Sequence, residues 1–277
     1  MVLFGLASAI AWGAGDFGGG MASRRGPVFG VSLVVQVLGA ILAAGLAVVA
    51  GEVVPAPGAL ITSAAAGVAV VVGILCLYQG LAVGRMGVVA PVTGVIAATL
   101  PVVFGMAVAG LPSVPVMAGI GFALLAVILV SRVPALDGAR TGIEFGLVGG
   151  IGIGLFNILI GQLPTGHVFT PLFIVKLTAT LVIVGLAIVG RQAWRLPPAT
   201  LPLALTVGVF DMAGNALYVL ATQAGRLDVA ATLSSLYPVT TILLAIGLLG
   251  ERVTRSHALG IAAAAAGIVL IGAGGGA

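Results

Sequence analysis

Three ionisable residues, Asp16, Lys176 and Asp211, stand inside long apolar stretches of the sequence. An ionisable side chain near the middle of a membrane costs roughly 2.5–3.5 kcal/mol on insertion scales, so such residues usually face a cavity or an oppositely charged partner. A buried carboxylate can bind and release a proton, and a buried ammonium can pair with a carboxylate or attract an anion. These residues are therefore the first candidates for a pathway that carries protons or a small solute.

Asp211 begins the clearest polar pattern, because Asn215 and Tyr218 follow it at spacings of four and seven residues. In a helix these spacings place all three side chains on one face. One interpretation is a cavity wall that coordinates substrate or protons, and the other is a seam of hydrogen bonds between helices. Both interpretations stay open, and the cavity wall is the working hypothesis.

Asp16 is surrounded by glycines such as Gly13 and Gly15, which leave room for a ligand or a neighbouring helix. It is a candidate proton or cation site, or else an interfacial residue that pairs with Arg24 or Arg25.

The long side chain of Lys176 could extend to the membrane surface. The alternatives are a salt bridge with Asp211 and attraction of an anionic substrate. Five further polar residues are weaker candidates for the wall of the substrate or ion pathway, and helix packing is the preferred interpretation for each. They are Gln36, Tyr78, Gln79, Asn157 and Gln223.

The composition places these residues in a membrane protein. Hydrophobic residues make up 61% of the 277 residues and charged residues only 6%, against about 25% charged residues in soluble domains. The surroundings of the chain must therefore be largely lipid. The eleven Lys and Arg residues are scattered, which argues against nucleic-acid binding.

Several other functional classes lack a signal. Cys76 is the single cysteine, so no intrachain disulfide is expected. His167 and His257 have no histidine partner at metal-binding spacing, so we expect no bound metal. No nucleophile–base motif is visible, so we expect neither enzymatic activity nor a cofactor. The pattern Gly13-x-Gly15-x-x-Gly18 lies in an apolar span and is interpreted as close packing rather than a dinucleotide site.

Stretches of about 20 apolar residues predict ten membrane-spanning helices. Proline lacks a backbone N–H, so helix kinks are expected at Pro91, Pro101 and Pro238. The predicted helices run over 2–22, 28–50, 59–82, 87–109, 114–131, 143–163, 170–190, 200–222, 228–249 and 256–274.

The two halves of the chain are related by a shift of 141 residues. We expect a first five-helix repeat over 1–131 and a second over 143–277, joined by a connection over 132–142. Because five is odd, the second repeat must insert upside down, and inverted repeats are typical of transporters. The shift superimposes Phe4-Gly5-Leu6 on Phe145-Gly146-Leu147, Asp16 on Asn157, Gly84-Arg85 on Gly225-Arg226, and Gly119-Ile120 on Gly260-Ile261.

The arginines predict an orientation, because cytoplasmic loops carry an excess of positive charge. If both termini lie outside, only Arg226 falls in an outer loop. The arginines that then lie inside are Arg24, Arg25, Arg85, Arg132, Arg140, Arg191, Arg195, Arg252 and Arg255.

Three segments stand in order along the chain: Trp12-Gly13-Ala14-Gly15-Asp16-Phe17, the stretch 81–91, and Leu248-Leu249-Gly250-Glu251-Arg252. Together they resemble EamA-type proteins of the drug/metabolite transporter superfamily, and the resemblance covers nearly the whole chain. It implies ten helices, a central cavity between the repeats, and transport of small metabolites. Two features depart from the family: Gly110-Leu111-Pro112 replaces a Gly-Glu-Arg turn, and family members are expected to keep both termini in the cytoplasm.

We therefore expect a multi-pass protein of the cytoplasmic membrane, a monomer or homodimer, that moves a small metabolite or drug-like solute. Protons are the candidate coupling ion. A lipid flippase and a non-transporting assembly or sensor subunit remain the alternatives.

Overall fold

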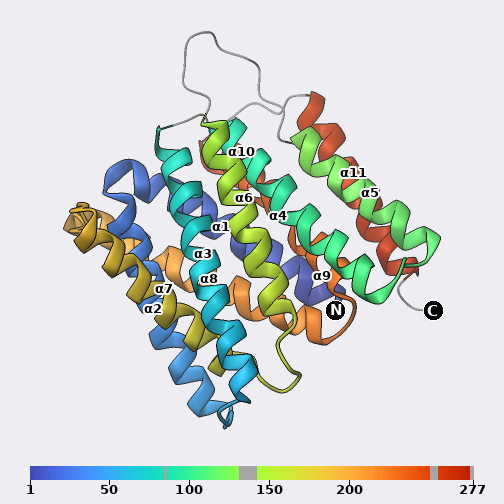
Figure 1. The fold of residues 1–277 in the computed structure, drawn as a ribbon. Coiled ribbons are helices and arrows are strands. Elements are labelled where there is room, and N and C mark those ends of the chain that lie inside the picture. Colours follow the sequence, from blue (N-terminus) through green and yellow to red (C-terminus); the bar gives the residue numbers. More distant parts are fainter. Residues whose placement is uncertain (84–85, 131–141, 250–254, 275–277) are drawn as a thin grey trace.

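The computed structural model describes residues 1–83, 86–130, 142–249 and 255–274. Within these ranges the chain forms eleven α-helices and one short 3-10 helix, and no strand (Figure 1). The elements are α1 (Val2–Arg25), α2 (Val28–Val49), α3 (Pro57–Val83), α4 (Met86–Ala109), α5 (Val114–Val130), α6 (Ile143–Gly161), α7 (Phe169–Val189), η1 (Pro198–Thr200), α8 (Leu201–Gln223), α9 (Leu227–Ser234), α10 (Tyr237–Leu249) and α11 (Arg255–Gly274).

The expectation of an all-helical, multi-pass membrane protein is confirmed for the described residues. Seven helices are long and apolar enough to cross a membrane: α1, α2, α3, α4, α6, α7 and α8. In α5 and α11 the apolar stretches are shorter. Several predicted features lie outside the described residues, namely Gly84-Arg85, Arg132, Arg140, the connection 132–141 and the Gly250-Glu251-Arg252 turn.

The predicted span 228–249 is divided into two helices. α9 ends at Ser234 and α10 begins at Tyr237, with Pro238 as its second residue. Proline suits the first turn of a helix because the N–H it lacks would have no partner there. By contrast, α4 runs through Pro91 and Pro101 as one helix.

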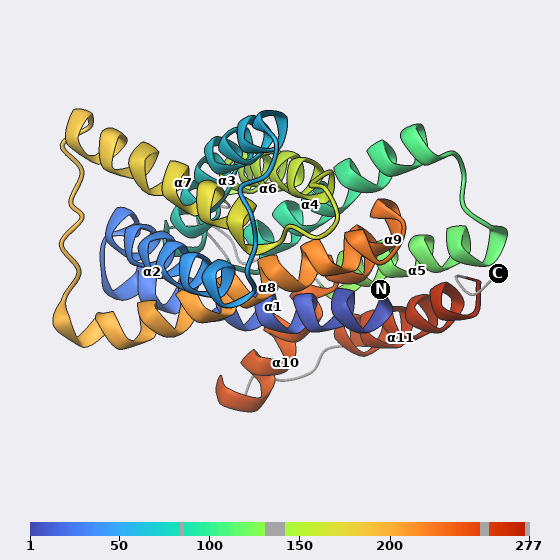
Figure 2. The ribbon, with the colours of Figure 1, turned by 90° about the horizontal axis from the view of Figure 1, so that it is seen from below.

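The helices pack mainly as pairs that join the first half of the chain to the second. α1 packs on α8, α3 on α6, α2 on α7, and α5 on α11 (Figures 1 and 2). α4 contacts both α6 and α9, and α1 contacts both α9 and α10. The helices of the two halves are thus interleaved rather than forming two separate bundles.

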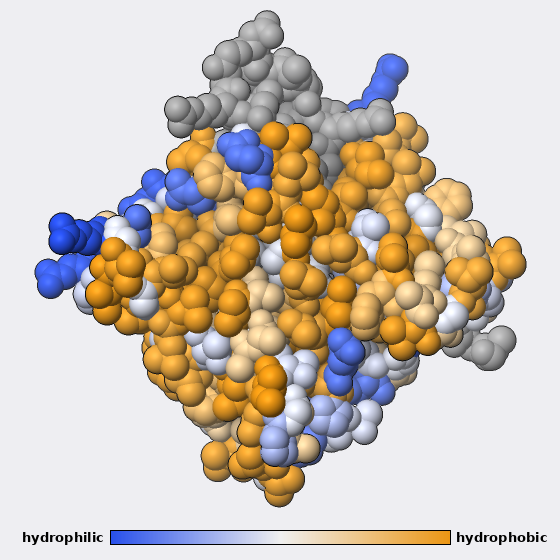
Figure 3. All heavy atoms as spheres, viewed as in Figure 1, coloured by the Kyte–Doolittle hydropathy of each residue, from blue (hydrophilic) through white to orange (hydrophobic). Residues whose placement is uncertain are grey.

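Glycines allow these helices to approach closely. An ideal Cβ on Gly73 of α3 would lie 2.6 Å from Cγ1 of Ile153 in α6, and one on Gly119 of α5 would lie 2.9 Å from the carbonyl oxygen of Gly267 in α11. Small residues at crossings are the usual means of tight packing in a membrane. The outer surface is apolar over most of the face in Figure 3, as lipid contact requires.

Candidate functional site

A small cavity of about 50 Å³ lies where helices of the two halves meet. A single water molecule needs at least about 10–15 Å³, so the cavity has room for only a few waters, and a metabolite needs the helices to separate further. Its polar wall comes from α1 and α8, and its apolar wall from α3 and α6, with α10 adding one tyrosine. The lining residues are Trp12, Asp16, Val70, Ile74, Leu77, Ile153, Phe156, Asp211, Asn215 and Tyr237.

Lys176 and Asp211 form an ion pair beside this cavity. The Lys176 side chain is fully buried and the Asp211 side chain is 14% exposed. The methylene groups of Lys176 pack against Gly39 of α2, where an ideal Cβ would lie 3.1 Å from Cδ and Cε of the lysine. Lys176 therefore does not extend to the membrane surface, because Asp211 offers a partner inside the protein.

A chain of hydrogen bonds continues from Asp211 along the polar face of α8. Nδ2 of Asn215 donates to Oδ1 of Asp211 at 3.4 Å, and Nε1 of Trp12 donates to Oδ1 of Asn215 at 3.0 Å. The hydroxyl of Tyr218 donates to the backbone oxygen of Asn157 at 3.1 Å. The face predicted for α8 therefore combines both interpretations: Asp211 and Asn215 line the cavity, and Tyr218 joins α8 to α6.

Asp16 lines the same cavity from α1. The crossing of α1 and α8 brings it near Asp211, because an ideal Cβ on the preceding Gly15 would lie 3.7 Å from the backbone N of Asp211. Among the described residues no ion pair or hydrogen bond is assigned to the Asp16 carboxyl. Arg24, an alternative partner, instead donates from Nε to the backbone oxygen of Leu81 at 3.5 Å.

The remaining predicted polar residues divide between packing and loop contacts. Tyr78 is buried, and its ring packs on Gly19 of α1. Gln79 is half-buried on α3 and is not part of the cavity wall. Asn157 is buried, with its side-chain Oδ1 unbonded, and Gln223 donates to backbone oxygens of the loop between α6 and α7.

Two buried polar side chains on α2 also lack partners. Ser32 and Gln36 are fully buried, and neither the Ser32 hydroxyl nor the Gln36 amide makes a hydrogen bond in this conformation. They lie one helical turn apart, on the helix that contacts the Lys176 side chain through Gly39.

The sequence analysis did not identify the aromatic side chains of the cavity, Trp12, Phe156 and Tyr237. Trp12 precedes Asp16 by four residues, so helical spacing could have placed it on the same face. The rings of Trp12 and Tyr218 pack with centroids 5.3 Å apart.

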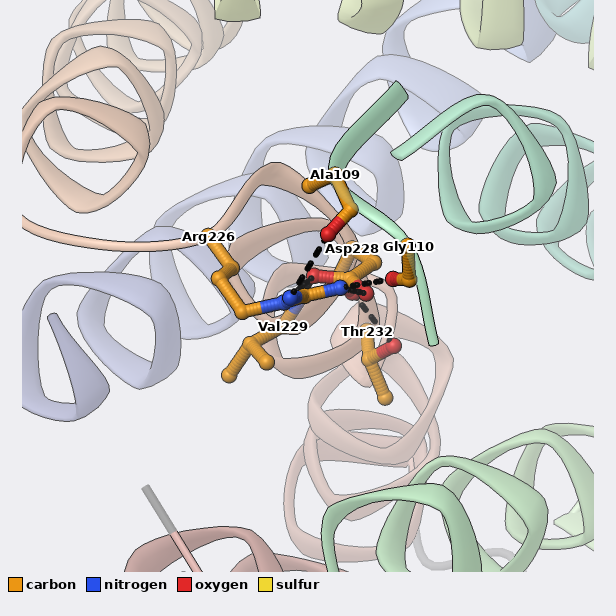
Figure 4. Close-up of polar contacts among 6 residues, drawn as sticks. All are labelled: Ala109, Gly110, Arg226, Asp228, Val229 and Thr232. Atoms are coloured by element: carbon orange, nitrogen blue, oxygen red, sulfur yellow. Dashed lines mark hydrogen bonds and ion pairs between the residues drawn. The ribbon is translucent and has the colours of Figure 1, made fainter. Parts of the chain in front are cut away.

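Two charged contacts also join the halves near the helix ends. Glu52, in the turn after α2, accepts hydrogen bonds from the backbone N of Val168 at 2.9 Å, Phe169 at 3.0 Å and Thr170 at 2.7 Å. Burial alone would raise the pKa of Glu52, but the bonds from Phe169, Thr170 and Val168 outweigh it, so the pKa lies below its ordinary value. Arg226, at the start of α9, contacts Asp228 and the end of α4 (Figure 4).

Comparison with known proteins agrees with this architecture. No curated protein matches the chain. One crystal structure of a protein superposes with a TM-score of 0.76 over 97% of this chain and 94% of that chain, at 14% sequence identity, so the likeness is one of fold. Residues 140–273 match the model of the EamA-like transporter family. The second half of the chain therefore matches the EamA-like transporter family, in agreement with the resemblance drawn from the sequence.

Proposed function

We propose that the protein is a secondary transporter that moves a small metabolite or drug-like solute through a passage between two inverted five-helix halves, with protons as the coupling ion. The observation that carries the proposal is the cavity between the halves, whose wall holds Asp16 and Asp211. Carboxylates facing an intramembrane cavity are typical of ion and proton pathways.

The helix pairing supports the inverted repeats. The shift of 141 residues carries Trp12 to Ile153 and Gly73 to Gly214. Gly214 packs on Trp12, and Gly73 packs on Ile153, so one crossing repeats the other. The partners run antiparallel, since Gly80 packs on Phe145 while Gly73 packs on Ile153.

The same shift relates the two walls of the cavity. It carries Val70 to Asp211 and Ile74 to Asn215, and all four residues line the cavity. One wall has therefore kept apolar residues where the other has polar ones. A solute in the passage would lie between an apolar surface and a polar surface, which suits a small molecule with both kinds of group.

The charges around the cavity favour a proton or a cation. Lys176 neutralises Asp211, which leaves the Asp16 carboxyl as the unpaired acidic group of the described cavity wall. A proton that binds there and crosses a potential of 100 mV releases about 2.3 kcal/mol, enough for roughly a fifty-fold concentration ratio of solute.

We propose an orientation with both termini outside. At one end of the described structure, Gly26 packs on Leu196, so the turn with Arg24 and Arg25 and the connection with Arg191 and Arg195 lie at the same end. At the other end, Arg226 shares a hollow with Met1 and Gly274. The positive-inside rule assigns the first end to the cytoplasm. A C-terminal reporter that works only in the cytoplasm should therefore stay inactive, and strong activity would reverse the orientation.

The transport proposal is tested in proteoliposomes. A screen for compounds that raise the melting temperature of the purified protein identifies a ligand, and uptake of that compound in radiolabelled form is then driven by a pH gradient. Asp16→Asn should lose gradient-driven uptake at normal expression, because the unpaired carboxyl of the described cavity wall can then no longer bind a proton. Glu144→Gln is the matched control, because Glu144 is exposed at the start of α6. Wild-type uptake in Asp16→Asn would remove Asp16 from the mechanism.

A further inference from the structure

The seam between α4 and α9 ends in a cluster of contacts made by Arg226. Its Nε donates to Oδ1 of Asp228 at 3.0 Å, and its Nη2 donates to Oδ2 at 2.8 Å. The same guanidinium donates to the backbone oxygens of Ala109 at 3.4 Å and Gly110 at 2.5 Å (Figure 4). We call these four residues, Arg226, Asp228, Ala109 and Gly110, the clasp.

The clasp fits the chemistry of a helix end. Ala109 is the last residue of α4, and Gly110 follows with φ of +74°. The last carbonyl groups of a helix have no partner within it, and they carry partial negative charge that attracts a cation. The planar guanidinium can meet these carbonyls and a carboxylate at the same time, which an ammonium group cannot do with the same geometry.

Asp228 anchors the clasp on α9. Its side chain is fully buried, and its Oδ1 also accepts from the backbone N of Val229 at 2.9 Å. The hydroxyl of Thr232 donates to the Asp228 backbone oxygen at 2.7 Å. Arg226 and Asp228 therefore form one unit with the start of α9, whereas Ala109 and Gly110 belong to α4.

Glycine permits α4 to touch α9 and the start of α10 along one continuous seam. An ideal Cβ on Gly105 would lie 2.8 Å from the backbone N of Asp228 in α9, and one on Gly94 would lie 3.2 Å from the hydroxyl oxygen of Tyr237 in α10. Tyr237 also lines the central cavity. The seam from Gly94 to Gly110 spans 16 residues, about 24 Å at 1.5 Å per residue, so it reaches from the cavity to the end of the bundle.

Beyond the clasp lies a hollow of about 620 Å³. Met1 and Val2 line it from α1 and its cap, Leu111 from the turn after α4, and Arg226 and Val229 from the start of α9. The start of α9 thus has space beside it on the side away from the cavity.

We propose that the clasp is the gate that closes the central passage at the end of the protein that holds Met1 and Gly274. The inference rests on the proposed function, because it needs a passage to close. Opening moves the start of α9 away from α4, with the interruption at Ser235 and Leu236 as the hinge. The Arg226–Asp228 pair travels intact. Of its hydrogen bonds only those to the two carbonyl groups break, and the packing of Gly105 on Asp228 opens. Opening therefore leaves no buried charge unpaired.

Trp12 provides a native reporter for this gate. It lines the cavity, and the second tryptophan of the chain, Trp194, is exposed in the loop between α7 and η1. In a Trp194→Phe background, quenching by acrylamide, a small neutral solute, measures access to the cavity. In this background Arg226→Gln is compared with Arg25→Gln, which removes the same charge from an exposed position at the opposite end.

The two bonds to the carbonyl groups are exposed to solvent, so each contributes little, and their loss should raise the ratio of open to closed protein about tenfold. We expect a rise of about threefold in the acrylamide quenching constant for Arg226→Gln and none for Arg25→Gln. Equal quenching in the two variants would overturn the proposal.

Arg226→Gln leaves the buried Asp228 without its cation and could fail to fold. Arg226→Gln/Asp228→Asn removes both charges, and the same rise in quenching is expected from this double variant. A double variant that folds and quenches like Arg25→Gln would also overturn the gate. Acrylamide access needs no transported substrate, so the quenching experiment tests the gate independently of transport. A wild-type protein that shows no solute uptake in proteoliposomes would count against the proposed function but not against the role of the clasp.

Discussion

Breaking the Lys176–Asp211 ion pair should destabilise the protein more than removing it altogether. The Lys176 side chain is fully buried and that of Asp211 is 14% exposed, so loss of one partner strands a charge in a low-dielectric site. Such single losses cost about 3–5 kcal/mol, whereas apolar replacement of a whole buried pair is often neutral. Lys176→Met keeps the side-chain packing against Gly39, which limits the change to the charge.

We expect Lys176→Met to lower the free energy of unfolding by about 3 kcal/mol. The loss is at the low end of the range because Asn215 still donates to Asp211 and some water reaches the carboxylate. Asp211→Asn should cost more, about 4–5 kcal/mol, because no partner is assigned to the buried ammonium other than Asp211 and the Lys176 side chain is fully buried. The double variant Lys176→Met/Asp211→Asn should lie within about 1 kcal/mol of wild type.

The assay is unfolding in sodium dodecyl sulfate, followed by far-UV circular dichroism, with the four proteins arranged as a double-mutant cycle. The predicted coupling free energy is about 6–8 kcal/mol, the sum of the two single losses less the small loss in the double variant. Additive effects of the two substitutions, or a loss below about 1 kcal/mol for each single variant, would refute the reasoning that the pair is buried and mutually dependent.

Two further predictions concern contacts between the halves. Glu52→Gln should reduce stability at neutral pH by about 1–3 kcal/mol, because the charged carboxylate accepts three backbone hydrogen bonds. Since the pKa of Glu52 is lowered in the folded protein, this stabilisation is present above the unfolded pKa and is lost as pH falls through the folded pKa. A difference in unfolding free energy between wild type and Glu52→Gln that does not shrink in acid would contradict this prediction. Gly73→Ala should cost about 1–3 kcal/mol, because the new Cβ would lie 2.9 Å from the backbone N of Ile153. The control Gly45→Ala, with nothing within 4 Å of the new Cβ, should be neutral or stabilising, and equal losses in both would refute the role of the crossing.

The helices could be predicted because lipid imposes one rule on every span: about 20 apolar residues with all backbone groups bonded internally. The predicted span 170–190 and the observed α7 (Phe169–Val189) differ by one residue at each end. The break between α9 and α10 after Ser234 was harder to predict from the sequence. Pro238 indicates a disturbed helix nearby but does not show at which residue α9 ends.

The site was predicted less completely. Spacing alone placed Asp211, Asn215 and Tyr218 on one face of α8. It could not choose a partner for Lys176, because extension to the surface and pairing inside both satisfy a lysine in a membrane. That choice depends on which helices meet, as does the role of Trp12, whose indole N–H bonds Asn215 on a helix about 200 residues away in the sequence.

The passage itself can be tested by asking whether the cavity can be reached from both sides of the membrane. Ile153 lines the cavity, so Ile153→Cys in a Cys76→Ser background places the single thiol there. Leu181→Cys, at a 63% exposed position on the outer surface of α7, serves as a lipid-facing control that should stay unlabelled. A membrane-impermeant maleimide should label the Ile153→Cys protein from either face of oriented vesicles. Labelling from neither face, or from one face only under every condition, would contradict a passage between the two halves.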